Sequence, residues 1–159
     1  MPVVLQNRQR VVGLDRVWLR RTAEAVLSAV RADNAELSLV LVSDRRMRTL
    51  NRRYRKKDRP TDVLAFPLTL SPAGRGWGAG RNPPMLLGDI VISVPTARRQ
   101  AAELGHGLRE ELRHLLVHAV LHLMGYDHER GPRDAALMAR KEQAILKALG
   151  GMVRVGLQE

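Results

Sequence analysis

The sequence predicts an α+β fold in which a small mixed β-sheet packs against several helices. Two observations carry this prediction. Short runs rich in leucine and β-branched residues alternate along the chain with longer segments of helical periodicity. The 159 residues, 45% of them hydrophobic, suffice for one domain with its own core. We therefore expect residues 1–159 to form a single domain.

The first half of the chain predicts a helix, a strand and a second helix. Leu14 to Val30 places its apolar residues on one broad stripe, which is typical of an amphipathic helix. Glu36 to Val42 alternates leucines with other residues, which predicts a strand. Ser43 and Asp44 are good N-caps for the helix that follows. The inward side of that helix is expected to carry Met47, Leu50, Asn51 and Tyr54.

The second half predicts two strands and three helices around a glycine-rich loop. The loop, from Ser71 to Pro84, holds four glycines and three prolines, which argues against a regular element. Gly125 is expected to end the longest helix. The expected strands are Val63–Leu68 and Asp89–Val94, and the expected helices are Thr96–Glu103, Leu108–Met124 and Pro132–Leu149.

The positive charge of the chain is concentrated in one segment. The formal net charge is +11, and residues 45–59 hold nine basic residues against Asp58 alone. Such a surface suits polyanions, either a nucleic acid or an anionic membrane face. We expect a nucleic acid, because the charge is local rather than spread along the chain. The alternative is a solvated face that reflects a general preference for arginine.

Two absences in the sequence narrow the possible functions. The chain has no cysteine, so a transition metal would have to be held by histidine and carboxylate. No stretch is long and apolar enough to span a membrane, and the first residues lack the apolar core of a secretory leader. We therefore expect a cytoplasmic protein without a membrane partner.

Three histidines between His118 and His128 have a spacing that predicts a metal site. On a helix, His118 and His122 lie one turn apart on the same side, about 6 Å along the axis, so both imidazoles can bind one ion. Gly125 then ends the helix, and the returning chain can bring His128 as a third ligand. Three neutral nitrogens leave one position for water, which is typical of a catalytic zinc site.

His114 lies on the same side of this helix, but we expect it not to bind the ion. About 12 Å of helix rise separates His114 from His122, which is too far for both to reach one metal. We expect His114 to pack near the site or to serve there as a proton-transfer group.

The histidine segment departs from a protease pattern at one position. Its spacing follows the H-E-x-x-H-x-x-G-x-x-H motif, so we expect a zincin-like metal-binding helix. Ala119 stands where zinc proteases carry the glutamate that acts as general base. Since alanine cannot transfer a proton, a phosphodiester is the better substrate, with an arginine to stabilise its charge.

Three segments taken together resemble the bacterial YbeY family. They are the histidine segment, the segment Leu50 to Pro67 with its Tyr-Arg-Lys-Lys-Asp sequence, and Leu87 to Ser93. The resemblance implies a metal-dependent endoribonuclease that cleaves single-stranded RNA, processes the 3′ end of small-subunit ribosomal RNA, and serves ribosome assembly and quality control. It implies Arg55 as the functional arginine and one zinc ion bound by His118, His122 and His128.

These expectations combine into one mechanistic hypothesis with two alternatives. A phosphate clamped by Arg55 would be attacked near the metal, with His114 as a proton carrier. One alternative is a non-catalytic RNA-binding ribosome assembly factor with a structural metal, and the other is a zincin-type peptidase. Other divalent transition metals could replace zinc, and the oligomeric state is left open.

Overall fold

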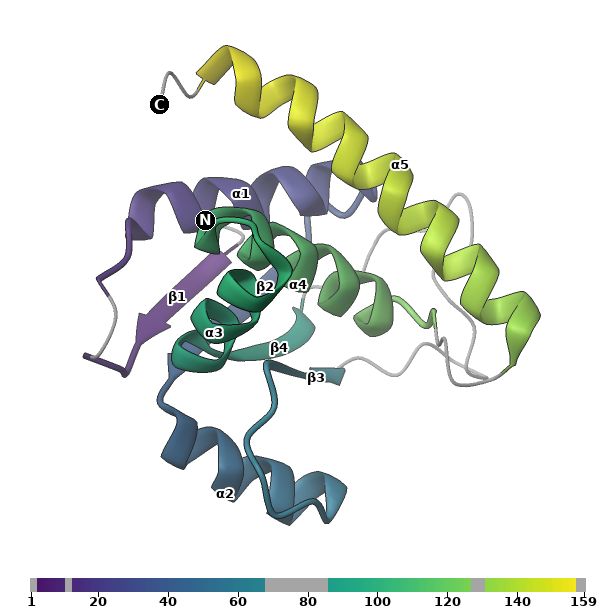
Figure 1. The fold of residues 1–159 in the computed structure, drawn as a ribbon. Coiled ribbons are helices and arrows are strands. Elements are labelled where there is room, and N and C mark those ends of the chain that lie inside the picture. The colour runs from purple at the N-terminus through teal and green to yellow at the C-terminus, as the bar shows by residue number, and fades with distance from the viewer. Residues whose placement is uncertain (1–2, 11–12, 68–85, 127–130, 157–159) are drawn as a thin grey trace.

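A computed structural model describes residues 3–156 of the chain, apart from residues 11–12, 68–85 and 127–130 (Figure 1). Strands and helices alternate along most of this part of the chain. In order they are β1 (Val3–Asn7), α1 (Arg16–Ala29), β2 (Glu36–Val42), α2 (Asp44–Arg55), β3 (Val63–Pro67), β4 (Leu86–Ser93), α3 (Val94–Leu104), α4 (Leu108–Leu123) and α5 (Pro132–Gly156).

The strands form one mixed sheet in the order β1-β2-β4-β3. β1 and β4 both pair with β2 in parallel, whereas β3 pairs with β4 in antiparallel orientation. Helix α1 makes the crossover that two sequential parallel strands require. β3 is therefore an edge strand. The predicted α+β class with a small mixed sheet is confirmed.

Apolar side chains cover both faces of the sheet. Leu37, Leu39 and Leu41 alternate along β2, are fully buried, and belong to a cluster that includes residues of α1, α4 and α5. Val42 of the same strand packs on the opposite face with Met47 of α2. Figure 1 shows α2 on one side of the sheet and the long helices α1, α4 and α5 on the other. The edge strand β3 thus lies between α2 and α4.

The start of the chain contains a strand that the sequence analysis does not predict. In β1, Val3 and Leu5 are buried whereas Val4 is 51% exposed, which is the alternation of a half-buried strand. A run of five residues at the chain start has too few repeats to distinguish a strand from an irregular segment. Its place becomes evident only from its pairing with β2.

The junction between β4 and α3 lies earlier than predicted. β4 begins at Leu86 rather than at Asp89 and ends at Ser93. The Ser93 side chain then accepts a hydrogen bond from the backbone N–H of Thr96, so Ser93 is the N-cap of α3 and Val94 belongs to the helix.

The two C-terminal helices also differ in their ends from the prediction. α4 ends at Leu123, and Gly125 follows with φ of 101°, in the left-handed region that favours glycine. α5 continues to Gly156, past its predicted end at Leu149. Within the described ranges, no helix is both long and apolar enough to cross a membrane. The loop predicted at 71–84 lies outside the described residues.

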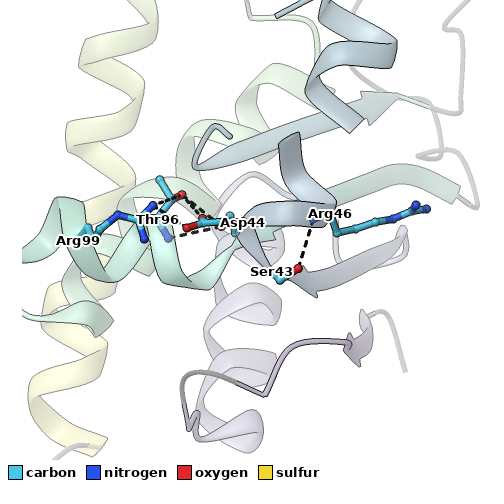
Figure 2. A network of polar contacts seen from close by, with 6 residues as sticks. Ser43, Asp44, Arg46, Thr96 and Arg99 are labelled. Atoms are coloured by element: carbon cyan, nitrogen blue, oxygen red, sulfur yellow. Dashed lines mark hydrogen bonds and ion pairs between the residues drawn. The ribbon is translucent and has the colours of Figure 1, made fainter. Parts of the chain in front are cut away.

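Asp44 joins the N-terminal ends of α2 and α3 (Figure 2). The hydroxyl groups of Thr96 and Ser93 donate to Asp44 Oδ1 over 2.6 and 2.7 Å, and Arg99 lies 2.7 Å from Oδ2. Burial alone would raise the pKa of Asp44, but these hydrogen bonds and the Arg99 charge together lower it below its ordinary value of 3.8. The beginning of α2 is therefore fixed against α3, beside the sheet.

We predict that Asp44→Ala lowers the free energy of unfolding by about 2 kcal/mol at neutral pH, because charge-assisted hydrogen bonds are lost. The folded pKa of Asp44 is depressed, so its contribution is present above pH 3.8 and is lost as the pH falls through the folded pKa. Urea unfolding of both proteins across this range should show the difference shrinking in acid. The exposed Asp33→Ala is the control, and an equal loss in that variant would contradict the account.

Candidate active site

A pocket of about 650 Å³ lies at the β3 edge of the sheet. The C-terminal end of α2 lines one side of it, and α4 with one residue of α5 lines the other. The pocket therefore brings together segments far apart in the sequence. Its charged and titratable lining residues include Arg55, Asp62, His114, His118, His122 and Glu142.

Helix α4 forms one wall of this pocket and part of the core at once. Leu112 and Leu116 are fully buried on one side of the helix. His114, His118 and His122 follow each other at intervals of four residues and all line the pocket. The predicted placement of His118 and His122 on one side of a continuous helix is found in the structure.

His118 is oriented by a carboxylate from another helix. Its Nδ1 lies 3.2 Å from Oε2 of Glu142 in α5. The side chains of His118 and Glu142 are 33% and 23% exposed, so the contact is partly shielded from water. A ring held in this way keeps one tautomer and one orientation in the pocket.

The third predicted metal ligand is not among the described residues. His128 lies outside the described residues, as does its neighbour Asp127. Among the residues that are described, no three histidine, cysteine or acidic side chains are grouped closely enough to hold an ion. The described donor set is the pair His118 and His122, and the predicted trio stays a prediction.

Arg55 reaches the pocket because of how α2 ends. Arg55 is the last residue of α2, and Lys56 follows in the left-handed conformation with φ of 57°. Asn51 is 1% exposed, and its side-chain nitrogen donates to the backbone oxygen of Arg59 over 2.8 Å. This hydrogen bond fixes the turn after α2 against the helix. The position of Arg55, between the helix and the turn, is thereby fixed as well.

The basic surface predicted over residues 45–59 is formed by α2 and the turn after it. Its nine basic side chains are all exposed. The segment's one acid, Asp58, accepts two hydrogen bonds from Arg48, at 2.8 and 3.0 Å, and lies 3.7 Å from Arg52. The Arg48 hydrogen bond lowers the pKa of Asp58. The segment keeps a strong net positive charge beside the pocket.

His114 contacts a second histidine that belongs to a polar network. The His106 ring stacks on His114 with centroids 6.1 Å apart and planes 8° apart. His106 Nε2 also lies 2.7 Å from Oε1 of the buried Glu111. When its amide nitrogen faces the acids, Gln100 donates to both Glu111 and Asp62, at 3.1 and 3.0 Å. The network therefore connects α3 and α4 to the loop before β3.

Glu142 and Tyr54 both line the pocket, although neither was singled out from the sequence as a site residue. The sequence does contain a signal for Glu142. It is a carboxylate on the apolar stripe of its helix, between Met138 and Ile145, which are both buried. Tyr54 was expected on the inward side of α2, yet it is 56% exposed at the pocket. Its position beyond the sheet edge depends on packing between distant segments.

Comparison with known proteins gives consistent matches over most of the chain. The profile of a family described as endoribonuclease YbeY matches residues 4–150. A protein of that name from Aquifex aeolicus is 43% identical, over 92% of this chain and 91% of its own length. One from Pelotomaculum thermopropionicum is 44% identical, over 94% and 97%. The solution structure of TM1509 from Thermotoga maritima has a TM-score of 0.65 and 25% identity, and the match covers 97% of this chain and 93% of that one.

Proposed function

The chain belongs to the YbeY family of endoribonucleases, and on that premise we propose that its pocket cleaves single-stranded RNA with the help of a divalent metal ion. The observation that carries this proposal is that an arginine and a row of histidines line opposite sides of the same pocket. Arg55, which belongs to the basic surface, lines the pocket on one side, and the imidazoles of α4 line it on the other. An RNA strand lying along α2 would pass its phosphates between them.

The chemistry of two histidines in the described part of the pocket supports the proposal of a zinc ion. Imidazole is a preferred zinc ligand, and the carboxylate of Glu142 gives His118 the support that zinc-binding histidines commonly have. His118 and His122 would hold the ion together with His128, and another divalent transition metal could take the same ligands. When bound, such an ion supplies Lewis acidity and lowers the pKa of water.

Two further side chains act on the substrate directly. Arg55 would bind the phosphate through two parallel N–H groups and stabilise the negative charge that grows on it in the transition state. His114 is an exposed imidazole in the same pocket and would carry a proton between the attacking and leaving oxygens. Stacking on His106 limits the orientations of the His114 ring.

The two alternative functions are not favoured. A zincin-type peptidase needs a general base beside the first histidine ligand, and Ala119 at that position is 1% exposed and has no titratable group. A non-catalytic assembly factor would use a closed structural metal site. The histidines instead line a space of about 650 Å³, large enough to admit part of an RNA strand.

The biological substrate we propose is ribosomal RNA. The exposed basic side chains suit any RNA backbone, and the family resemblance in the histidine and Tyr-Arg-Lys-Lys-Asp segments points to the 3′ end of small-subunit ribosomal RNA. We place this activity in the cytoplasm during ribosome assembly and quality control, where a chain without cysteine needs no oxidising compartment.

The first test is cleavage of a labelled RNA that spans the 3′ end of the small-subunit precursor. We predict that His118→Ala removes both zinc binding and cleavage, because a metal ligand is lost. Arg55→Glu should keep zinc but slow cleavage by about a hundredfold or more, since the phosphate loses its guanidinium. Zinc content and cleavage rate are measured on the same samples.

Arg21→Glu is the matched control for this test, because it makes the same charge change at an exposed position of α1, outside both the basic surface and the pocket lining. It should retain most of the cleavage rate. Equal weak cleavage by all four proteins would indicate a contaminating nuclease and a binding role for this chain.

Glu142 allows a separate test of the metal site. We predict that Glu142→Leu weakens zinc binding by about 10- to 100-fold, because His118 loses the acceptor that orients it. Glu142→Gln keeps an acceptor and should lose less. Titration against a competing chelator measures the affinity, with the neighbouring exposed Gln143→Leu as control. Unchanged affinity in Glu142→Leu would remove this carboxylate from the site.

A further inference from the structure

Tyr54 and Phe66 form an aromatic pair on the wall of the pocket. Their ring centroids are 5.1 Å apart and their planes make an angle of 67°, which is an edge-to-face contact. Tyr54 comes from the last turn of α2 and Phe66 from β3, and both line the pocket. The pair therefore adjoins Arg55, the next residue after Tyr54.

The exposure of Tyr54 calls for an explanation other than core packing. Met47 and Asn51, which share its side of α2, are buried, whereas Tyr54 is 56% exposed. Aromatic residues are scarce in this chain, which has two tyrosines and a single phenylalanine. That phenylalanine and one of the tyrosines meet at this pocket. A large exposed aromatic ring next to an exposed basic surface is typical of a binding surface.

A flat group already lies over the Tyr54 ring. The guanidinium carbon of Arg53 is 5.5 Å from the ring centroid, and the Arg53 side chain is exposed. An exposed cation–π contact is weaker than the stacking of a nucleobase on an aromatic ring. A base can therefore take the place of the guanidinium, which then turns to a phosphate.

We propose that Tyr54, supported by Phe66, is a stacking platform for one unpaired nucleobase, next to the phosphate bound by Arg55. This inference rests on the proposed function, because it places a base of the same RNA strand. Every base has a π-face, so the platform tolerates any sequence. It requires a base that is free to leave its own stack, so it selects single strands over duplexes.

Binding of two synthetic strands tests the platform. One is a short oligouridylate, and the other is a ribose–phosphate strand of the same length without bases. Affinities are measured for the metal-loaded wild type, Tyr54→Leu and Tyr54→Phe, and gel electrophoresis verifies that the strands stay intact. We expect the wild type and Tyr54→Phe to bind the strand with bases about tenfold more tightly than the strand without bases. Tyr54→Leu should bind both strands equally.

The dependence of affinity on salt gives a second readout. Tyr54 contacts no phosphate in this proposal, so Tyr54→Leu should leave the salt slope unchanged, whereas Arg55→Ala should reduce it by about one unit. A loss of affinity in Tyr54→Leu that is equal for both strands would overturn the platform and make Tyr54 a structural residue. The platform would also be overturned if Tyr54→Phe lost as much affinity for the strand with bases as Tyr54→Leu.

The failure of this inference can be told apart from the failure of the proposed function. If the wild type cleaves RNA but binds both strands with equal affinity, the function stands and the platform is wrong. If the wild type neither binds nor cleaves RNA, the function is wrong and the platform falls with it.

Discussion

Helix α4 is the element on which the rest of the structure depends, because it forms part of the core and one wall of the proposed active site at once. Its apolar side is buried against the sheet and the other long helices, and each of its buried leucines contributes about 2 kcal/mol of hydrophobic stabilisation. The same backbone carries His114, His118 and His122 at intervals of one helical turn. Because the helix is locked by its core contacts, the imidazoles are placed before any ligand arrives.

The location of the pocket follows from β3 being an edge strand. α2 and α4 cover opposite faces of the sheet, so their side chains meet only beyond that edge. The ends of α2 are both tied down, by Asp44 to α3 and by Asn51 to the returning chain. Arg55 and Tyr54 therefore project from a fixed helix, and the exposed basic side chains beside them favour the approach of a polyanion.

Local patterns allowed the sequence to predict most elements and part of the site. Helical periodicity located α4 with His118 and His122, and the capping residues before it located α2, whereas Arg55 was singled out only by the family resemblance. Contacts between distant segments could not be predicted from such local patterns. The pairing of β1, the reach of Glu142 from α5 to His118, and the exposure of Tyr54 all depend on tertiary packing.

The central claim is that α4 carries an open metal site across the pocket from Arg55. X-ray absorption spectroscopy at the zinc edge tests it most directly, because it counts the nitrogen ligands of the bound ion in the purified protein. The account predicts one zinc ion per chain, three imidazole nitrogens, and no fourth ligand from the protein. Zinc held by four protein ligands, or a purified protein that binds no metal, would contradict it.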